Sequence, residues 1–339
     1  MEHRHIGRSG LKISALTFGN WLTQGAEKDR DNATACIHAA LDAGIIGFDT
    51  ADTYAAGAAE ECLGNALKGE RRESLVVMSK AFFPAFDGKR GPNDVGLSRK
   101  HLIESIDGTL RRLGMEYVDV YQAHRYDAFT PLEETMQAFA DIIRSGKALY
   151  IGVSEWTAEA LQAGHTLARE LGVPLISNQA QYSALWRVIE DEVIPTSQEL
   201  GMGQLVWSPM AQGVLSGKYL PGQTPPQGSR ATDEESGGAR MISRWMTDPV
   251  LEGVQKLRPI ADDLGISMPQ LALAWVLANK NVASAIIGAS RPEQVAQNVR
   301  AAEVKPEPSV IAAVNSALAD VAVTDSSLTK DFTPKSRPE

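Results

Sequence analysis

The stretch Ile45-Ile46-Gly47-Phe48-Asp49-Thr50-Ala51-Asp52-Thr53-Tyr54 decides the fold and locates the first candidate chemistry. It begins as a short apolar run, which is typical of a buried strand covered on both faces. It then becomes polar, so that Asp49 lies at the carboxyl end of the strand and Tyr54 in the loop beyond. A carboxylate beside a phenol is a candidate proton-transfer pair, although an aspartate at a strand end also commonly caps a turn.

Outward from this stretch, a short apolar strand followed by a helical pattern recurs along the chain. Strands are predicted at residues 16–19, 45–49, 75–80, 118–122, 148–153, 175–179, 204–207 and 285–287. Eight alternating units predict an α/β fold, a single (β/α)8 TIM barrel, whose chemistry lies at the carboxyl ends of the strands. A doubly wound sheet is the alternative, and it is disfavoured because no strand is followed by G-x-G-x-x-G.

Several segments lie outside the repeating units of the predicted single domain, residues 1–339. Residues 3–17 predict an amino-terminal β-hairpin, and residues 309–319 an extra carboxyl-terminal helix. The stretch 221–247, rich in Pro, Gly and charge, predicts a lid-like loop. The polar tail, about 322–339, is expected to fray.

Two segments match the capping-box pattern, in which a Ser or Thr is followed three residues later by Glu. They are residues 130–133 and 290–293, and each predicts a helix start. A further helix is predicted over residues 187–200.

Composition limits the partners and the compartment. The formal net charge of −9 disfavours nucleic acid and anionic membrane surfaces. The longest apolar run, residues 271–278, is too short to span a membrane. With no apolar signal core at the start and two cysteines, Cys36 and Cys62, without metal spacing, we expect a reduced, cytoplasmic protein. No metal site is expected, since His3 and His5 share a strand face without Cys or carboxylate partners.

Four ionisable side chains fall at one mouth of the predicted barrel: Asp49, Tyr54, Lys80 and His124. Each alone has a structural explanation, such as a solvated lysine or a hydrogen-bonded histidine. Their gathering at the ends of consecutive strands favours a shared chemical role. An isomerase or aldolase that forms a Schiff base on Lys80 is a further alternative, which the neighbouring Asp49 and Tyr54 disfavour.

The segments that carry these four residues resemble the Asp–Tyr–Lys–His tetrad of the aldo-keto reductases. They are residues 48–54, Ser79-Lys80 and Gln122-Ala123-His124. Within that superfamily, residues 207–219 and 288–290 are similar to the branch of the voltage-gated potassium-channel β-subunits and their bacterial relatives. The resemblance runs from about residue 4 to 320.

The resemblance implies an NADPH-dependent oxidoreductase that reduces aldehyde or ketone carbonyls to alcohols and works reversibly as an alcohol dehydrogenase. Tyr54 would be the general acid, with its pKa lowered by the ammonium of Lys80. Asp49 would anchor Lys80. His124 would donate a hydrogen bond to the carbonyl oxygen and stabilise its developing charge.

The resemblance also implies the contacts of the cofactor, NADPH/NADP+. Ser154 and Gln179 would hold the carboxamide, and Trp207 would stack on the ring unless it belongs to the barrel core. Residues 208–212 with Lys218 resemble the family's pyrophosphate loop, and Arg230 resembles its lid arginine. Arg291, at a helix amino terminus, favours a 2′-phosphate and hence NADPH over NADH, unless it is a solvated first-turn arginine. The full implied set is Asn20, Trp21, Asp49, Ser154, Gln179, Trp207, Ser208, Pro209, Met210, Ala211, Gln212, Lys218, Arg230, Gly288, Ser290, Arg291, Gln294, Gln297 and Asn298.

A small-molecule carbonyl substrate of apolar or aromatic character is expected, in a pocket formed by Trp21, Tyr54, Phe82, His124 and Trp156. A homo-oligomer is left open.

Three positions depart from the channel subunits. Glu155 replaces an arginine, Gln297 a glutamate and His124 an asparagine. The histidine favours an active reductase. The alternative is an NADPH-binding, redox-sensing regulatory subunit of a channel or other complex, with little turnover.

Overall fold

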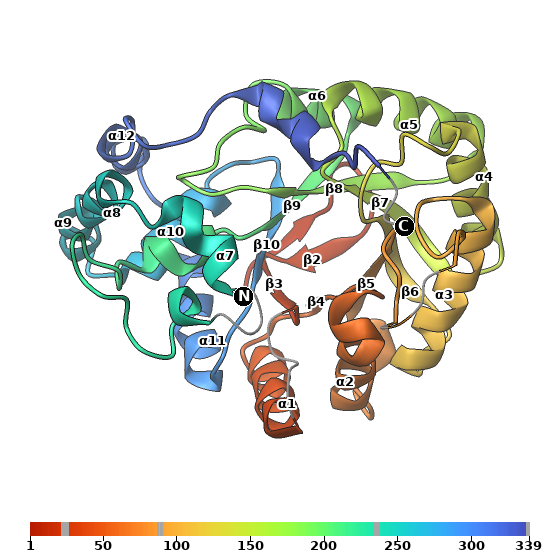
Figure 1. The fold of residues 1–339 in the computed structure, drawn as a ribbon, viewed down its shortest axis with the longest axis horizontal. Helices are drawn as coiled ribbons and strands as arrows, with labels where there is room; N and C mark the ends of the chain where they lie inside the picture. The colour runs from red at the N-terminus through yellow and green to blue at the C-terminus, as the bar shows by residue number, and fades with distance from the viewer. Residues whose placement is uncertain (22–26, 87, 89–90, 234–237, 337–339) are drawn as a thin grey trace.

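The computed structural model describes residues 1–21, 27–86, 88, 91–233 and 238–336. Eight parallel strands close into a barrel in the order β10-β3-β4-β5-β6-β7-β8-β9 (Figure 1). The strands are β3 (Leu16–Gly19), β4 (Gly47–Asp49), β5 (Val76–Ala81), β6 (Val118–Ala123), β7 (Ala148–Ser154), β8 (Leu175–Gln181), β9 (Gly203–Trp207) and β10 (Val282–Ile287). The predicted (β/α)8 barrel is confirmed.

The hairpin of β1 (His3–His5) and β2 (Lys12–Ser14) is antiparallel, as predicted. Its residues Ile6 and Ile13 are fully buried in an apolar cluster with side chains from the barrel strands. At the hairpin turn Gly7 has φ +57, and a Cβ there would lie 2.1 Å from the carbonyl oxygen of Gly201. The hairpin therefore packs tightly against the start of β9.

Helices surround the barrel (Figure 1). They are α1 (Glu27–Asp42), α2 (Ala58–Ala66), α3 (Arg99–Leu113), α4 (Leu132–Arg144), α5 (Ala158–Glu170), α6 (Val193–Leu200), α7 (Gly238–Ile242), α8 (Asp248–Gln255), α9 (Leu257–Asp263), α10 (Met268–Leu277), α11 (Pro292–Val299) and α12 (Pro308–Ala317). The amphipathic α3 is a clear local case: the Ser98 hydroxyl accepts from the His101 N–H at its start, and Gly114 ends it at φ 63. None of the helices in the described residues combines the length and apolar character that crossing a membrane requires.

Both predicted capping boxes are wrong, although both helices form nearby. α4 is capped by Pro131, and the Thr130 hydroxyl donates instead to Asp127 at 2.7 Å. α11 is capped by Arg291, while the N–H of Ser290 donates to the side chain of Gln294 at 2.8 Å.

The helix expected over residues 187–200 forms only from Val193, because residues 183–192 are occupied by a bridge and turns.

The lid-like segment 221–247 contains short helical turns, η4 (Arg230–Thr232), α7 and η5 (Ser243–Trp245), with 234–237 outside the described residues. The tail that was expected to fray is docked instead. The N–H of Val323 donates to Leu185 at 2.9 Å, and η7 (Ser326–Phe332) follows. The ring of Phe332 lies 6.2 Å from that of Trp207, so the tail reaches the end of β9. Residues 337–339 lie outside the described part.

Candidate active site

Lys80 is at the centre of the site. It lies near the carboxyl end of β5 and has no exposed surface. Its ammonium donates to Asp49 Oδ2 at 2.7 Å, to the Thr50 carbonyl at 2.6 Å and to the Tyr54 hydroxyl oxygen at 3.2 Å. An ammonium has three N–H bonds, so these contacts use all of them. Because the phenol oxygen accepts from Lys80, its own proton is directed elsewhere.

Asp49 is held from several strands at once. It is 3% exposed at the end of β4. Its Oδ1 accepts from Gln179 Nε2 at 2.8 Å and from Gln122 Nε2 at 3.4 Å, while Oδ2 accepts from Lys80. A buried ion pair is tolerated only when its remaining hydrogen-bonding capacity is satisfied, and the two glutamines of β8 and β6 provide this.

The charges of the tetrad follow from burial and pairing. Burial acts to lower the pKa of Lys80, but Asp49 and Tyr54 outweigh it and the pKa is raised, so the ammonium persists at neutral pH. Burial raises the pKa of Tyr54 above its ordinary value, and the opposing effect of Lys80 does not overcome this. The expected net lowering is therefore not found. The phenol is protonated at neutral pH, as a proton donor must be.

Tyr54 is presented by a strained turn, η1 (Tyr54–Gly57). Ala55 and Ala56 adopt left-handed φ values of 48° and 52°. Non-glycine residues in this region cost of order 1–3 kcal/mol each and cluster at functional sites. The Tyr54 ring packs edge-on against Trp21 at 6.5 Å, and Trp21 is 39% exposed.

His124 follows β6 directly, and its ring centroid lies 5.7 Å from that of Tyr54. Burial lowers the pKa of His124 well below its ordinary value, and the charges of Arg125 and Lys80 act in the same direction. The imidazole is therefore neutral at pH 7. Its Nδ1 is buried and has no hydrogen-bond partner within the described residues. A neutral imidazole donates one hydrogen bond, which suits a carbonyl oxygen.

The four residues of the tetrad thus meet at the mouth of a closed parallel barrel. A sequence model of the Aldo/keto reductase family matches residues 15–319. The chain belongs to the aldo/keto reductase family. It is 42% identical over 310 residues to the "Probable voltage-gated potassium channel subunit beta" of Oryza sativa subsp. japonica, covering 90% of this chain and 92% of that protein. The Arabidopsis thaliana protein of the same name is 41% identical with the same coverage, and the "Putative voltage-gated potassium channel subunit beta" of Schizosaccharomyces pombe is 42% identical over 305 residues, covering 88% of each.

Aldo/keto reductases typically bind nicotinamide cofactors, and a loop after β9 has suitable geometry. Ser208, Ala211 and Gln212 have left-handed φ values of 52°, 46° and 60°. Gln212 Nε2 donates to the Ser208 hydroxyl at 2.6 Å, and Arg230 of the lid-like segment donates to Gln212 Oε1. The arginine expected in the lid therefore contacts the loop expected to hold the pyrophosphate. Within the same stretch Pro209 is buried, Met210 is half-buried and Lys218 is exposed.

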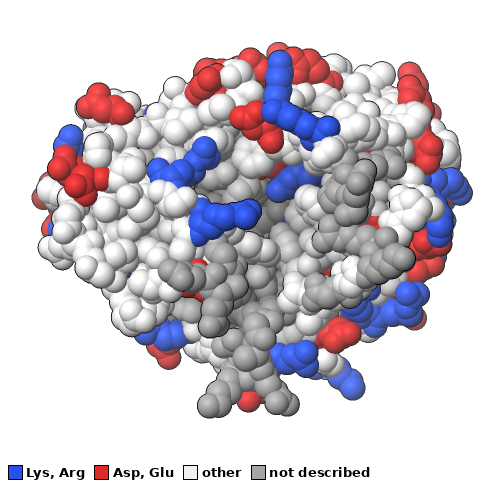
Figure 2. Space-filling model, viewed as in Figure 1, with Lys and Arg blue, Asp and Glu red and all other residues white. Residues whose placement is uncertain are grey.

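A second segment expected to contact the cofactor is the amino end of α11. Ser290 and Arg291 are exposed, and Arg291 is the N-cap residue, so its guanidinium is accessible to an anion there. Gly288 is half-buried, Gln297 exposed and Asn298 buried. Figure 2 shows basic side chains around a hollow in the middle of the viewed face. This charge suits a phosphorylated cofactor.

The residues expected around the nicotinamide ring already have hydrogen-bond partners within the protein. The Ser154 hydroxyl donates to the Gln179 carbonyl at 2.9 Å. Trp207 is half-buried, and its Nε1 donates to Glu155 at 2.6 Å. Asn20 donates to the Ala59 carbonyl at 2.8 Å, but its side-chain oxygen is buried without a partner in the described residues. That oxygen leaves acceptor capacity for a carboxamide, as does the Oε1 of Gln179, which accepts from no donor in the described part of the chain.

Two expected pocket residues do not reach the pocket surface. Phe82 and Trp156 are both 1% exposed and belong to the apolar core. The Trp156 ring packs against Gly164 of α5, where a Cβ would lie 2.7 Å from Cζ3. The Phe82 ring lies 4.9 Å from that of Phe83. They support the pocket wall from behind and do not line it.

Arg125 and Phe332, which are not among the predicted site residues, also lie near the tetrad, as does Phe83, one of the aromatic residues that suggested an apolar or aromatic carbonyl. The Phe83 ring lies 5.4 Å from that of His124, and the Arg125 guanidinium lies 5.9 Å from the Phe332 ring. Arg125 directly follows His124, so its place beside the tetrad was visible in the sequence. Phe332 lies in a polar tail without any periodic pattern, and nothing local indicated its position.

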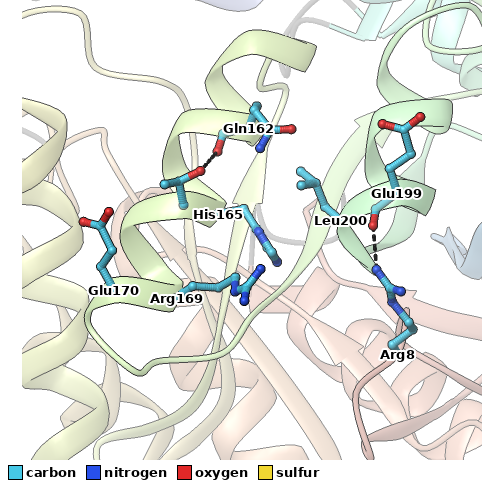
Figure 3. A pocket seen from close by; sticks show the side chains of 8 residues that line it. Arg8, Gln162, His165, Arg169, Glu170, Glu199 and Leu200 are labelled. Atoms are coloured by element: carbon cyan, nitrogen blue, oxygen red, sulfur yellow. Dashed lines mark hydrogen bonds between the residues drawn. The ribbon is translucent and has the colours of Figure 1, made fainter.

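A separate groove of about 430 Å³ lies between α5 and α6 beside the hairpin turn (Figure 3). Its basic residues are Arg8, His165 and Arg169. Arg8 donates to the carbonyl of Glu199 in the last turn of α6 at 2.5 Å. A cation at a helix carboxyl terminus stabilises the helix, so this arginine has a structural role and the groove contains no part of the tetrad.

Proposed function

We propose that this aldo/keto reductase reduces aldehyde or ketone carbonyls to alcohols with NADPH. The observation that carries the proposal is the full use of the Lys80 ammonium. With its three N–H bonds directed to Asp49, Thr50 and Tyr54, the lysine fixes the phenol oxygen and leaves the phenol proton free for a substrate.

Each residue then has a defined task. The neutral His124 orients the carbonyl oxygen by hydrogen bonding. When bound, NADPH supplies the hydride that adds to the carbonyl carbon. Tyr54 donates its proton to the oxygen as negative charge develops there, and the resulting phenolate is stabilised by Lys80. Asp49 holds Lys80 in place. In alcohol oxidation, Tyr54 would act as the base.

The cofactor contacts proposed for this chain match the donor groups available. Ser154 and Gln179 would bind the carboxamide, and Trp207 would stack on the ring. Arg230, through its contact with Gln212, would cover the pyrophosphate. Arg291, exposed at the start of α11, would meet the 2′-phosphate and favour NADPH over NADH.

The direct test is to mix the purified chain with NADPH and a panel of aldehydes and ketones, and with NADH in parallel. The proposal expects carbonyl-dependent loss of absorbance at 340 nm, faster with NADPH. Tight NADPH binding without oxidation by any carbonyl would contradict it.

A second candidate is a regulatory subunit that senses redox state, because the relatives named above are called channel subunits. This candidate predicts slow turnover with every carbonyl and an effect of NADPH on binding to a partner. The neutral His124 beside Tyr54 favours the enzyme, since it supplies a hydrogen-bond donor for a carbonyl oxygen.

A further inference from the structure

The strained turn that presents Tyr54 packs against Arg112, in the last turn of α3. The turn ends at Gly57, which is also the N-cap of α2 and has a φ of 93°. A Cβ added at Gly57 would lie 2.7 Å from Arg112 Cδ and 3.0 Å from its Nε. The stem of the arginine therefore lies directly against the turn, and glycine is needed there both for its φ and for this close approach.

Arg112 also forms an ion pair with the helix that follows the turn. Its Nε donates to Glu60 Oε2 at 2.7 Å, and Glu60, in the first turn of α2, has no exposed surface. The other carboxylate oxygen, Oε1, accepts from the Ser79 hydroxyl of β5 at 2.6 Å. Ser79 immediately precedes Lys80 in the chain. One buried carboxylate thus joins the helix that begins at the Tyr54 turn to the strand that carries Lys80.

These contacts lie behind the pair whose geometry decides proton transfer. The Tyr54 hydroxyl oxygen accepts from Lys80 at 3.2 Å, although the two side chains come from different elements. Between Tyr54 and Gly57, both Ala55 and Ala56 have left-handed φ values, a strain that persists only where the surroundings hold it. A displacement of about 1 Å at a reacting group lowers a rate by up to about a hundredfold. Support of this turn therefore matters for the chemical step.

We propose that Arg112 is a positioning residue for Tyr54: through Gly57 and Glu60, it holds the phenol at hydrogen-bonding distance from Lys80. This rests on the reductase function proposed above and adds to it a residue that acts through the turn and not on the substrate. A purely structural role would be shared by any similar ion pair in the chain, so the test needs such a pair for comparison.

The chain offers a matched pair at the other end of the barrel. Arg72, in η2 (Arg72–Ser74), donates to Asp119 Oδ2 at 2.7 Å. The Arg72 and Arg112 side chains are 21% and 20% exposed, and each pairs with a buried carboxylate. Asp119 is the second residue of β6, so its pair lies at the amino ends of the strands, opposite the mouth. Arg72→Met and Arg112→Met should therefore lower the melting temperature by similar amounts.

The activity test measures carbonyl-dependent NADPH oxidation by both variants and by the wild type, with one aldehyde. We expect Arg112→Met to lower kcat about tenfold or more, with KM and the NADPH Kd within about threefold of wild type, because the phenol is displaced while the binding surfaces remain. Arg72→Met should keep kcat within about twofold, since the amino-terminal face of a barrel serves stability. Arg112→Lys keeps the charge but loses the planar fork, so kcat should fall only about threefold.

Hydrogen exchange of the full chain tests the turn itself, independently of turnover. Within the turn, the N–H of Ala56 donates to the Thr53 carbonyl at 3.2 Å. In peptides covering residues 51–58, exchange should be at least about tenfold faster in Arg112→Met than in wild type, and within about threefold of wild type in Arg72→Met.

Two results would overturn the proposal. One is a kcat for folded Arg112→Met no lower than that for Arg72→Met, and the other is a lower kcat with unchanged exchange in the turn. If Arg112→Met does not fold, Arg112→Lys takes its place, and a wild-type kcat in Arg112→Lys would overturn the proposal. Absence of turnover with every carbonyl would overturn the reductase function, and the exchange rates would then decide whether Arg112 holds the turn.

Discussion

Lys80 and Asp49 form an ion pair of 2.7 Å whose side chains are 0% and 4% exposed. Two charges so fully removed from water are costly unless each is paired and hydrogen-bonded. Here Gln179 of β8 donates to the carboxylate, and the carbonyl of Thr50, just after β4, accepts from the ammonium. The pair is thus a rigid support for Tyr54, and removing one partner has consequences for stability as well as for chemistry.

Lys80→Met leaves Asp49 as an unpaired buried charge. We expect the free energy of unfolding to fall by about 3–5 kcal/mol, as for other broken buried pairs. Urea unfolding followed by circular dichroism measures this. Lys68→Met, at an exposed position just after α2, is the control and should change stability by less than about 0.5 kcal/mol. A Lys80 variant as stable as this control would contradict the account.

Glu155 predicts a pH-dependent stability of definite sign. Burial raises its pKa from 4.5 to about 7 in the folded state, so between these values the folded chain binds more protons than the unfolded one. Stability from this group therefore falls as pH rises from about 5 to 8. Glu155→Gln should remove the effect. The free energy of unfolding of the variant minus that of the wild type should therefore be roughly 1–3 kcal/mol larger at pH 8 than at pH 5.

The measurement is urea unfolding of both proteins at the two pH values. Glu133→Gln, an exposed carboxyl in the first turn of α4, should show no such pH-dependent difference. If the difference in free energy of unfolding between Glu155→Gln and the wild type were the same at both pH values, this would argue against a buried, proton-binding carboxyl.

Arg291→Ala tests the proposed 2′-phosphate contact. Because NADH lacks that phosphate, the ratio of kcat/KM with NADPH to that with NADH should fall at least tenfold, mainly through NADPH. Arg300→Ala, an exposed arginine just after α11, is the control. If both variants keep the wild-type ratio, Arg291 is a solvated cap residue only.

Arg230→Ala tests the contact between the lid-like segment and the loop after β9. Loss of the bond to Gln212 should raise the Kd for NADPH about tenfold, with a smaller change in kcat. Fluorescence titration measures this. The comparison is Arg240→Ala on α7, which is exposed and should bind NADPH like wild type. Equal affinities in the two variants would remove Arg230 from the cofactor site.

The barrel and the tetrad were predictable from the sequence because their signals are local. Buried strands appear as short apolar runs, and the residue where each run becomes polar lies at the mouth, as for Asp49 and Lys80. The caps at Ser98 and Thr157 follow the same kind of local rule, since each hydroxyl accepts from a backbone N–H three residues on.

The misses came from competition between partners and from tertiary packing. Thr130 has the spacing of a capping box, but Asp127 takes its hydroxyl. Phe332 is positioned by the rings of Trp186 and Trp207, which are distant in sequence. The rise in the pKa of Tyr54 depends on its burial, which the spacing of charged residues does not reveal.

The central claim is that the Tyr54 hydroxyl supplies the transferred proton. Its most direct test is Tyr54→Phe, which keeps the ring and removes only that group, with NADPH affinity and carbonyl-dependent NADPH oxidation measured on the same preparation. The account predicts an NADPH Kd within about threefold of wild type and a fall in kcat of about 10²–10⁴ or more, the range for loss of a general acid. Carbonyl reduction within a few-fold of the wild-type rate would contradict it.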